Sequence, residues 1–189
     1  MGSMTISRLL HAETRDEWRE WLIGNYRSAR DIWLVTYKKA SGRTSVSYND
    51  AVEEALCFGW IDSTRKSIDA ERSAQRYSPR RKGSAFSQPN LERIDRMRDR
   101  GLVMPDVLPD VSQLRPEDYV IPDDILTALA AEPEALAFFE STSPSYQRIR
   151  AAYVDGSRAE PEQFAKRLAN LVDKCRRRKH FGHGIESYY

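Results

Sequence analysis

Two neighbouring stretches of the chain carry most of the side chains that could do chemistry, and both are suited to binding an anion. The first is Leu56–Ser63, and the second is Gln75–Lys82, which ends in three consecutive cations. Arginine donates in a planar fork that matches phosphate or carboxylate, and the free N–H groups of a helix that starts near Ser87 add further donors. We therefore predict a groove with these candidate ligand-binding residues: Trp60, Asp62, Arg76, Tyr77, Arg80, Arg81, Lys82 and Asn90.

These residues also have a plain structural interpretation. A run of cations such as Arg80–Lys82 is usually a solvated turn. Asp62 can simply pair with an arginine, and a strand aromatic such as Trp60 most often lies in a core. Both interpretations of the segment remain open at the level of sequence.

The strand register decides which of the candidates share a face. The pairs predicted across a tight turn at Ala70–Glu71 are Asp69 with Arg72, Asp62 with Pro79, and Thr64 with Tyr77. In that register Trp60, Asp62 and Tyr77 share one face of the sheet, and Arg76 lies on the other. A slip of one residue reverses these faces.

Other potential catalytic or metal-binding patterns are weak. His180 and His183 form an HxxH pair, which is a weak zinc signal because zinc needs further ligands than these two; a frayed terminus is the plainer interpretation. The chain has three histidines, and none is an obvious partner for Ser63 or Ser78, so a Ser-His-Asp hydrolase is not expected. We predict no catalytic residue, no metal and no cofactor.

Charge is concentrated in two segments. Five cations and no acid lie between Arg72 and Leu91, and Lys174–Lys179 holds five more, again with no acid. The second run can contact nucleic acid or acidic lipid, or it can stabilise a helix C-terminus against the helix dipole. We favour the helix C-terminus.

The elements that must position the candidate residues follow from local spacing. Thr14–Glu17 predicts a capping box that opens an amphipathic helix. Asp31–Lys38 is a β-branched and aromatic run, typical of a central strand that is buried on both faces. Ser47 caps a second helix, which Gly59 ends in a left-handed conformation.

The candidate residues themselves fall on the next elements. Trp60–Ile68 and Arg72–Pro79 are predicted to form a hairpin. Ser87 starts a third helix that Gly101 stops. The aperiodic, proline-containing segment Leu102–Tyr119 indicates a linker that lies against the surface.

The last third of the chain carries only helix signals. Pro122, Pro133, Pro144 and Pro161 each stand at a predicted helix start, and Phe164–Cys175 is a helical apolar stripe. Strands with a hairpin and segregated helices indicate an α+β fold. We predict a small mixed sheet with a hairpin and flanking helices, followed by a C-terminal helical unit.

We expect an N-terminal α+β domain over residues 5–101, a linker over 102–119 and a helical domain over 120–180.

Composition bounds the class of protein. Hydrophobic residues make up 40% and charged residues 31% of the 189 residues, which is typical of a globular protein. The net charge of +2 excludes a polycation. Two cysteines, Cys57 and Cys175, favour buried thiols in a reducing compartment over a disulfide.

No stretch approaches the roughly 20 apolar residues of a membrane helix, and no secretory signal is recognisable. We therefore expect a cytoplasmic protein without a membrane span. Met1–Ser3, ahead of Met4, is typical of an expression remnant and is left out of the fold prediction.

Several blocks of the sequence resemble the YdeI/OmpD-associated (bacteriocin-protection) family. Glu53–Ser63 (EEALCFGWIDS) and Arg76–Lys82 (RYSPRRK) match two of its motifs, and Phe86–Asn90 matches its aromatic-Ser-x-x-Asn helix start. Ile121–Ser145 resembles its helical C-terminal end. The resemblance begins at about Trp18 and covers most of the chain.

Two departures from the family pattern are Phe86, where the family usually has tryptophan, and the segment Val103–Gln113. The family name implies protection from bacteriocins or antimicrobial peptides, and it supplies no catalytic residue. The resemblance thus favours a cytoplasmic binding or stress-protection protein over an enzyme. Its partner would be an anionic small molecule or an acidic protein.

Two alternatives stay open. One is an enzyme or sensor for an anionic small molecule that uses Asp62, Arg76 and Arg80. The other is a nucleic-acid-binding module that uses the two basic segments, which is the less expected of the two because the net charge is small. Nothing in the sequence predicts an oligomeric state.

Overall fold

The structure is a computed structural model that describes residues 6–189. Met1–Ser3, the predicted expression remnant, and residue 5, the predicted start of the N-terminal domain, lie outside the described residues. The strands are β1 (Leu9–His11), β2 (Ile32–Tyr37), β3 (Trp60–Ser67) and β4 (Arg72–Pro79). The helices are α1 (Arg15–Asn25), α2 (Tyr48–Cys57), α3 (Gln88–Asp99), α4 (Leu108–Val111), α5 (Asp123–Ala130), α6 (Pro133–Ser141), α7 (Pro144–Asp155) and α8 (Pro161–Arg176). Three short 3-10 helices are η1 (Lys39–Ser41), η2 (Pro116–Asp118) and η3 (Glu186–Tyr188).

The chain divides into two compact units. The N-terminal unit comprises the residues up to Ala85 together with Arg93–Gln113, and the C-terminal unit comprises Phe86–Glu92 and Leu114–Tyr189. One of the boundaries, between Glu92 and Arg93, therefore falls inside α3. No helix within residues 6–189 has the length and apolar content needed to cross a membrane.

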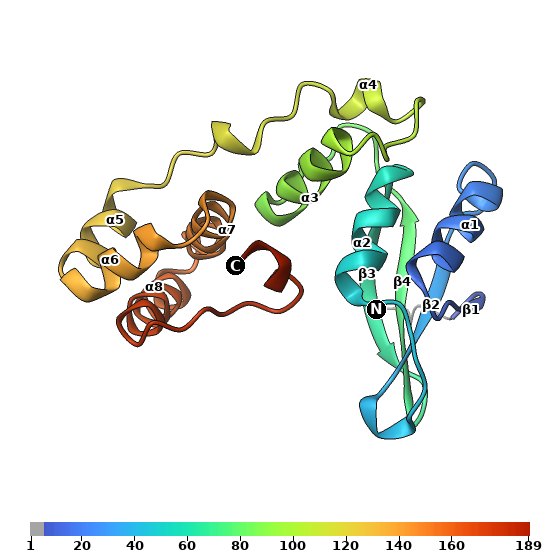
Figure 1. Cartoon of the computed structure of the whole chain (residues 1–189), viewed down its shortest axis with the longest axis horizontal. Helices are drawn as coiled ribbons and strands as arrows, with labels where there is room; N and C mark the ends of the chain where they lie inside the picture. The colour runs from blue at the N-terminus through green and yellow to red at the C-terminus, as the bar shows by residue number, and fades with distance from the viewer. Residues whose placement is uncertain (1–5) are drawn as a thin grey trace. The chain divides into compact units, whose positions relative to one another are not determined.

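The N-terminal unit is built on a four-stranded mixed sheet in the order β1-β2-β4-β3 (Figure 1). β1 runs parallel to β2, whereas β2 and β4 and then β4 and β3 are antiparallel. β2 lies in the interior of the sheet and its residues Ile32–Val35 are buried, as the sequence predicts for a central strand. The predicted α+β fold is confirmed.

Helix α1 packs against one face of this sheet. Trp18 lies 5.3 Å from the Tyr77 ring of β4, and its indole N–H donates to the Ala51 carbonyl of α2 at 3.0 Å. Trp21 meets Trp60 of β3 edge-on at 5.8 Å. These aromatic contacts tie α1 to α2 and to both hairpin strands, so the face that carries Trp60 and Tyr77 is the helix-covered face.

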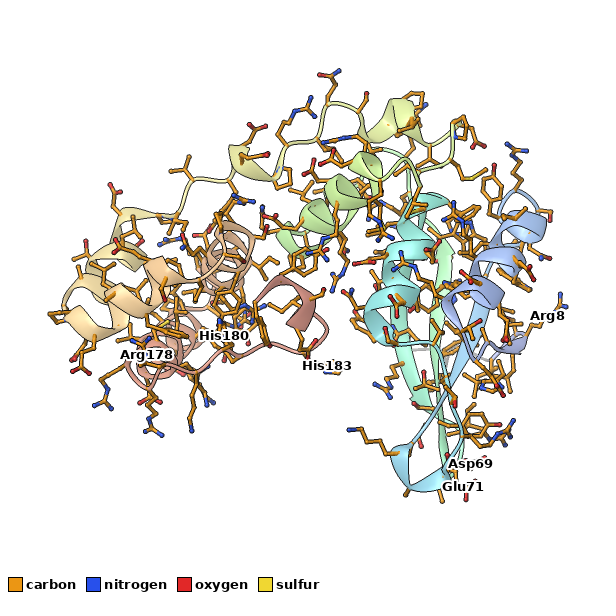
Figure 2. All side chains as sticks on the ribbon, in the orientation of Figure 1. Arg8, Asp69, Glu71, Arg178, His180 and His183 are labelled. Atoms are coloured by element: carbon orange, nitrogen blue, oxygen red, sulfur yellow. The ribbon has the colours of Figure 1, made fainter. Side chains whose placement is uncertain are left out.

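The β3–β4 hairpin forms where the sequence predicts it, but its register differs from the prediction. Trp60 pairs with Pro79 and Asp62 with Tyr77, and an irregularity follows between Asp62 and Arg65. The predicted partner of Asp62, Pro79, is therefore wrong. The tip of the hairpin is marked by Asp69 and Glu71 in Figure 2.

The physical reason for the difference is a pair of one-residue shifts. At the turn the N–H of Ile68 donates to the Arg72 carbonyl. Arg72 is therefore paired with Ile68, one residue earlier in the chain than the predicted partner Asp69. The bulge between Asp62 and Arg65 adds the second shift. Because side chains alternate with a period of two, the two shifts together leave Asp62 on its predicted face.

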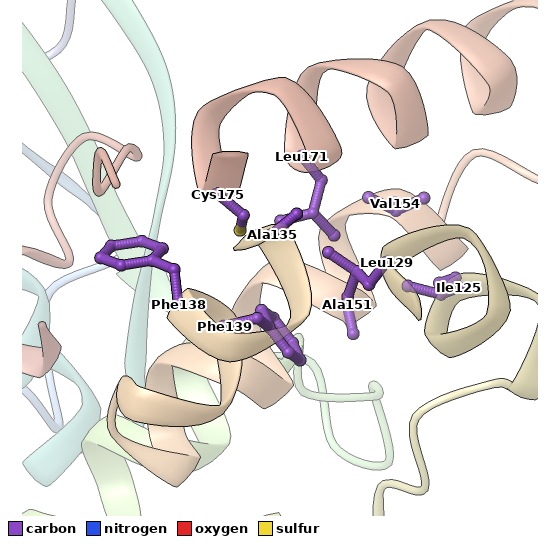
Figure 3. Close-up of a cluster of buried hydrophobic side chains, with 9 residues drawn as sticks. All are labelled: Ile125, Leu129, Ala135, Phe138, Phe139, Ala151, Val154, Leu171 and Cys175. Carbon is purple, nitrogen blue, oxygen red and sulfur yellow. The ribbon is translucent and has the colours of Figure 1, made fainter. Parts of the chain in front are cut away.

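The C-terminal unit contains helices that begin where their prolines predict. Ser143 caps α7 by accepting from the Tyr146 N–H, with Pro144 in the first turn. Its main core unites residues from α5, α6, α7 and α8, shown in Figure 3: Ile125, Leu129, Ala135, Phe138, Phe139, Ala151, Val154, Leu171 and Cys175. The apolar stripe predicted for α8 therefore faces this core.

The segment predicted as a linker, 102–119, contains two short helices, α4 and η2. Val103 and Val111 are buried, and the Met104 N–H donates to the Cys57 carbonyl at the end of α2. Propensity and period cannot reveal these short helices, because four residues are too few to establish a pattern.

Candidate functional site

The structure divides the candidate residues of the N-terminal unit among two faces of the sheet and one turn. The helix-covered face carries Trp60, Asp62 and Tyr77, because Asp62 pairs directly with Tyr77. Trp60 and Tyr77 are each only 1% exposed, and the Trp60 indole N–H donates to the Tyr26 carbonyl at 3.1 Å. These two aromatics are core side chains, whereas Asp62 is half-buried.

Two polar side chains that the sequence did not single out surround Asp62. The Tyr48 hydroxyl, at the first residue of α2, donates to Asp62 Oδ2 at 3.1 Å, and the Gln75 amide donates to the same oxygen at 3.1 Å. Gln75 also donates to the Ser63 carbonyl. A sequence signal existed for Gln75, which lies two residues before Tyr77 on the same strand and therefore on the same face.

The electrostatics of this carboxyl are unusual. Burial raises the pKa of Asp62, although the hydrogen bond from Tyr48 and the charge of Arg93 act in the opposite direction. Burial, with the Asp62 charge, also raises the pKa of Tyr48 to about 12. Arg93 is itself only 3% exposed, and its Nε donates to Asn49 at 3.0 Å. Asp62 thus forms a polar cluster with Tyr48 and Gln75.

Arg76 lies on the opposite face of the sheet from Asp62, as predicted. Its guanidinium forms an ion pair with Asp31 at 2.8 Å, and Ser7 donates to the other oxygen of that carboxylate at 2.6 Å. The hydrogen bond from Ser7, together with Arg76, lowers the pKa of Asp31 despite partial burial. The structure therefore does not bring Arg76 and Asp62 into one site.

The turn after β4 carries the three consecutive cations. The Arg80 guanidinium donates to the Ser84 carbonyl at 2.9 Å, to the Ser84 hydroxyl at 3.2 Å and to the Ala85 carbonyl at 3.2 Å. Burial lowers the pKa of Arg80. Arg81 and Lys82 are exposed, and neither forms an ion pair with a carboxylate of residues 6–189. Arg80 thus organises the turn that displays the other two cations.

The acids that could neutralise this turn are engaged elsewhere. Asp69 pairs with Arg72 at 2.6 Å at the tip of the hairpin, and Asp31 holds Arg76. Asp62 accepts from Tyr48 and Gln75. The positive charge of the turn is therefore not cancelled by these three aspartates.

Asn90, the last candidate residue, lies in the first turn of α3, where its N–H donates to the Ser87 carbonyl. It belongs to the C-terminal unit, whereas the other seven candidates belong to the N-terminal unit. Within the N-terminal unit, those seven candidates are divided between two faces of the sheet and the turn after β4.

A buried ion network was missed by the sequence analysis. Glu53 and Glu54 on α2 are 2% and 1% exposed. Glu54 accepts from Arg15 and from Arg19, each at 2.5 Å, and Glu53 accepts from Arg15 at 2.8 Å. The two acids stand between the apolar residues Val52 and Ala55 of α2, and that position was the available signal for a buried network.

The histidines of the C-terminal segment do not form a metal centre. No group of three or more His, Cys, Asp or Glu side chains in the described part of the chain is arranged to hold a metal ion. His180 stacks on Tyr189 at 4.8 Å, and His183 is exposed. The segment is packed rather than frayed, because Ile185 and Tyr188 are buried against α7.

Comparison with known families covers both units. Residues 10–109 match the family described as "Domain of unknown function (DUF8412)". Residues 118–178 match the family described as "Bacteriocin-protection, YdeI or OmpD-Associated". No curated protein and no solved structure matches the chain.

The two matches bear differently on the blocks that carried the resemblance. Ile121–Ser145 falls within the second match, which confirms the resemblance to the YdeI/OmpD-associated family. Glu53–Ser63 and Arg76–Lys82 fall within the first match, which spans more than half of the chain. The chain therefore belongs to the family of the domain of unknown function DUF8412, and it carries a C-terminal domain of the YdeI/OmpD-associated, bacteriocin-protection family.

Proposed function

We propose that this chain is a cytoplasmic binding protein of the stress-protection type, and that its N-terminal unit engages an acidic protein partner or an anionic small molecule through the turn Arg80–Lys82. The observation that carries the proposal is the exposure of Arg81 and Lys82 on a turn whose own carbonyls are held by Arg80. Ordered presentation of cations lowers the entropy lost on binding.

The three cations of the turn have different surroundings, and this difference supports a binding role. The Arg80 guanidinium donates to acceptors within the turn, whereas Arg81 and Lys82 are exposed to solvent. A charge-assisted hydrogen bond from arginine to an oxyanion is about twice as strong as a neutral one. Catalysis by a combined Asp62–Arg76 constellation is not favoured, since these side chains lie on opposite faces of the sheet.

The experiment compares charge-reversal variants for binding to a fluorescent oligo-glutamate peptide and to inorganic phosphate. Arg81→Glu/Lys82→Glu leaves Arg80 in place, and we expect it to weaken peptide binding at least about tenfold. The matched control is Lys38→Glu/Lys39→Glu, another adjacent, exposed pair in the same unit with the same change in net charge. Equal losses in both variants would reduce the effect to net charge and contradict the proposal.

Salt dependence separates this proposal from nucleic-acid binding. A protein that contacts several phosphates loses affinity steeply with salt, because bound counterions are released. We expect the chain to prefer the oligo-glutamate peptide to a single-stranded oligonucleotide of equal charge. Tighter, strongly salt-dependent oligonucleotide binding would favour the nucleic-acid alternative.

A second candidate function rests on the Asp62 cluster. A half-buried carboxyl with a raised pKa beside two tyrosines is an arrangement often found at functional sites. This observation favours a small-molecule enzyme or sensor built on Asp62, Tyr48 and Gln75, without Arg76. The test is a thermal-shift screen of small polar metabolites with wild type and Tyr48→Phe, in which a ligand of this site stabilises only the wild type.

A further inference from the structure

Arg150 of the C-terminal unit is a buried cation without a counter-charge. It lies on α7 and is 6% exposed. Burial lowers its pKa. Its Nε is sealed from solvent and has no hydrogen-bond partner within residues 6–189, and no ion pair joins it to a described carboxylate. A buried charge without a partner costs far more than a paired one.

The neighbouring arginine on the same helix shows the contrast. Arg148 is paired with Glu92 through two hydrogen bonds, at 2.6 and 2.9 Å. The unit therefore supplies a carboxylate to one arginine of α7 and none to the other. Arg150 is enclosed instead by aromatic rings: its Cζ lies 5.0 Å from the Phe181 ring centre, 5.6 Å from Tyr153 and 5.9 Å from Tyr146.

The segment after α8 is shaped around this guanidinium. Gly182 has φ +118°, which favours glycine, and a Cβ added there would lie 2.7 Å from Arg150 Cζ, so a larger residue would displace the guanidinium. The segment is held by the Phe181 N–H, which donates to the Tyr146 hydroxyl at 3.1 Å, and by the Tyr189 hydroxyl, which donates to the Gly182 carbonyl at 2.6 Å. Arg178, His180 and His183 mark its course in Figure 2.

A second arginine approaches one of these rings, that of Tyr153. The Arg167 guanidinium of α8 lies 4.2 Å from the Tyr153 ring centre, and its Nη1 donates to the Tyr153 carbonyl at 2.8 Å. Arg167 Nε is also buried without a hydrogen-bond partner among the described residues. Two cations thus lie against the Tyr153 ring, and neither is neutralised by a carboxylate of residues 6–189.

Cation–π contacts offset part of the cost of this arrangement, but they leave the buried N–H donor at Arg150 Nε without an acceptor among residues 6–189. The missing complement is an oxyanion, which a guanidinium binds bidentately. Tyr153 and Tyr189 are 43% and 40% exposed, so aromatic surface is open beside the buried cation. Exposed rings next to a buried cation suit an apolar group attached to the anion.

We propose that Arg150, with Arg167 beside it, anchors the carboxylate of a small aromatic acid in the C-terminal unit, and that Tyr153 and Tyr189 contact the body of that ligand. This site is separate from the turn Arg80–Lys82 and does not depend on it. The site takes an aromatic carboxylate in preference to a bare oxyanion.

The experiment measures binding of benzoate to the full chain by titration calorimetry, with neutral benzamide and inorganic phosphate as comparison probes. We expect benzoate to bind more tightly than either, and Arg150→Met to weaken benzoate at least about tenfold. The matched control is Arg158→Met. Its guanidinium also lies over a ring, Phe164 at 4.7 Å, but Asp124 and Asp155 already pair with it. This control should bind benzoate as wild type does.

A further variant keeps the proposal testable if Arg150→Met fails to fold. Tyr153→Ala removes an exposed ring and leaves Arg150 intact, and we expect it to lose benzoate affinity by several-fold while phosphate affinity is unchanged. Unchanged benzoate affinity in folded Arg150→Met or in Tyr153→Ala would overturn the proposal. So would a wild-type protein that binds phosphate as tightly as benzoate, or that binds neither.

Discussion

Glu54 illustrates how much a single side chain holds together in the N-terminal unit. Its carboxylate is almost fully buried, and it accepts from two arginines of α1, Arg15 and Arg19, whose side chains are 25% and 24% exposed. Such a network stabilises the packing of α1 on α2 only while it is complete. Removal of one partner leaves the remaining charges poorly solvated.

We therefore expect Glu54→Ala to lower the free energy of unfolding by about 3 kcal/mol, because Arg15 and Arg19 lose their shared partner. Urea unfolding of the full chain measures this change. Glu20→Ala, at an exposed glutamate of the same helix pair, serves as the control and should change stability by less than about 0.5 kcal/mol. A decrease in the free energy of unfolding below about 1 kcal/mol for Glu54→Ala would contradict this expectation. It would show that water solvates the two arginines as well as the carboxylate does.

The raised pKa of Asp62 predicts how the stability of the fold depends on pH. Burial raises its pKa, so the folded state favours the protonated form. The associated stability is present below the unfolded pKa of Asp62 and is lost as the pH rises through the folded pKa. We expect Asp62→Asn, which is neutral throughout, to be more stable than wild type at neutral pH and to lose that advantage in acid.

Thermal unfolding as a function of pH measures the effect at Asp62, and Asp69→Asn is the control of opposite sign. Hydrogen bonds from Arg72 lower the pKa of Asp69. Its contribution is therefore present above its unfolded pKa and lost as the pH falls. If Asp62→Asn and Asp69→Asn shifted stability in the same direction at neutral pH, burial would not be the controlling influence on Asp62.

At the scale of elements, the connection between α2 and β3 depends on one glycine. Gly59 has φ +70°, and its carbonyl accepts from the Arg80 N–H, so the backbone at this point joins β3 to the end of β4. The position of Gly59 therefore determines where β3 places Asp62 and where β4 leads into the turn Arg80–Lys82. A left-handed residue here sets the direction in which β3 leaves the helix.

We expect Gly59→Ala to destabilise the chain by roughly 1–2 kcal/mol, because a Cβ in the left-handed region is strained. The added Cβ would meet Val107 at 3.4 Å, which is an ordinary contact, so strain rather than a clash is the cause. The control is Gly24→Ala within α1, where nothing lies within 4 Å; it should stabilise by about 0.5–1 kcal/mol. The measurement is the denaturant midpoint of each variant compared with that of wild type. Equal midpoints for Gly59→Ala and Gly24→Ala would contradict the prediction.

At the scale of the whole molecule, each compact unit has its own buried cysteine. Cys57 ends α2 in the N-terminal unit and Cys175 lies near the end of α8 in the C-terminal unit; both are free. Burial raises the pKa of Cys57 to about 12 and that of Cys175 to about 11. Neither sulfur is therefore a thiolate at neutral pH.

We expect neither thiol of the folded chain to react with a chromogenic disulfide reagent on the time scale of minutes, because both must be exposed by unfolding before they ionise. The same reagent in denaturant should report both thiols at once. Cys175 is the sharper test, since Arg176 and Lys174 flank it. Rapid native labelling at Cys175 would show that the last turn of α8 opens.

The sequence by itself determined the features that depend on near neighbours. The caps at Thr14 and Ser47 formed as predicted, because each hydroxyl accepts from an N–H three residues away, and the helix start predicted at Pro144 also formed. The buried character of β2 followed from its run of apolar residues, and the left-handed corner at Gly59 from the freedom of glycine. The predicted family was likewise carried by contiguous blocks.

Only the tertiary structure decided which distant side chains meet. Asp31 and Arg76 are 45 residues apart, and Tyr48 and Asp62 are 14 apart; no local rule pairs them. The hairpin register depended on a bulge whose position reflects packing of the whole sheet. Arg150 is a polar residue on an amphipathic helix, and its burial arises because the segment after α8 folds over it. Local energetics act over a few residues, whereas burial and charge pairing are properties of the assembled chain.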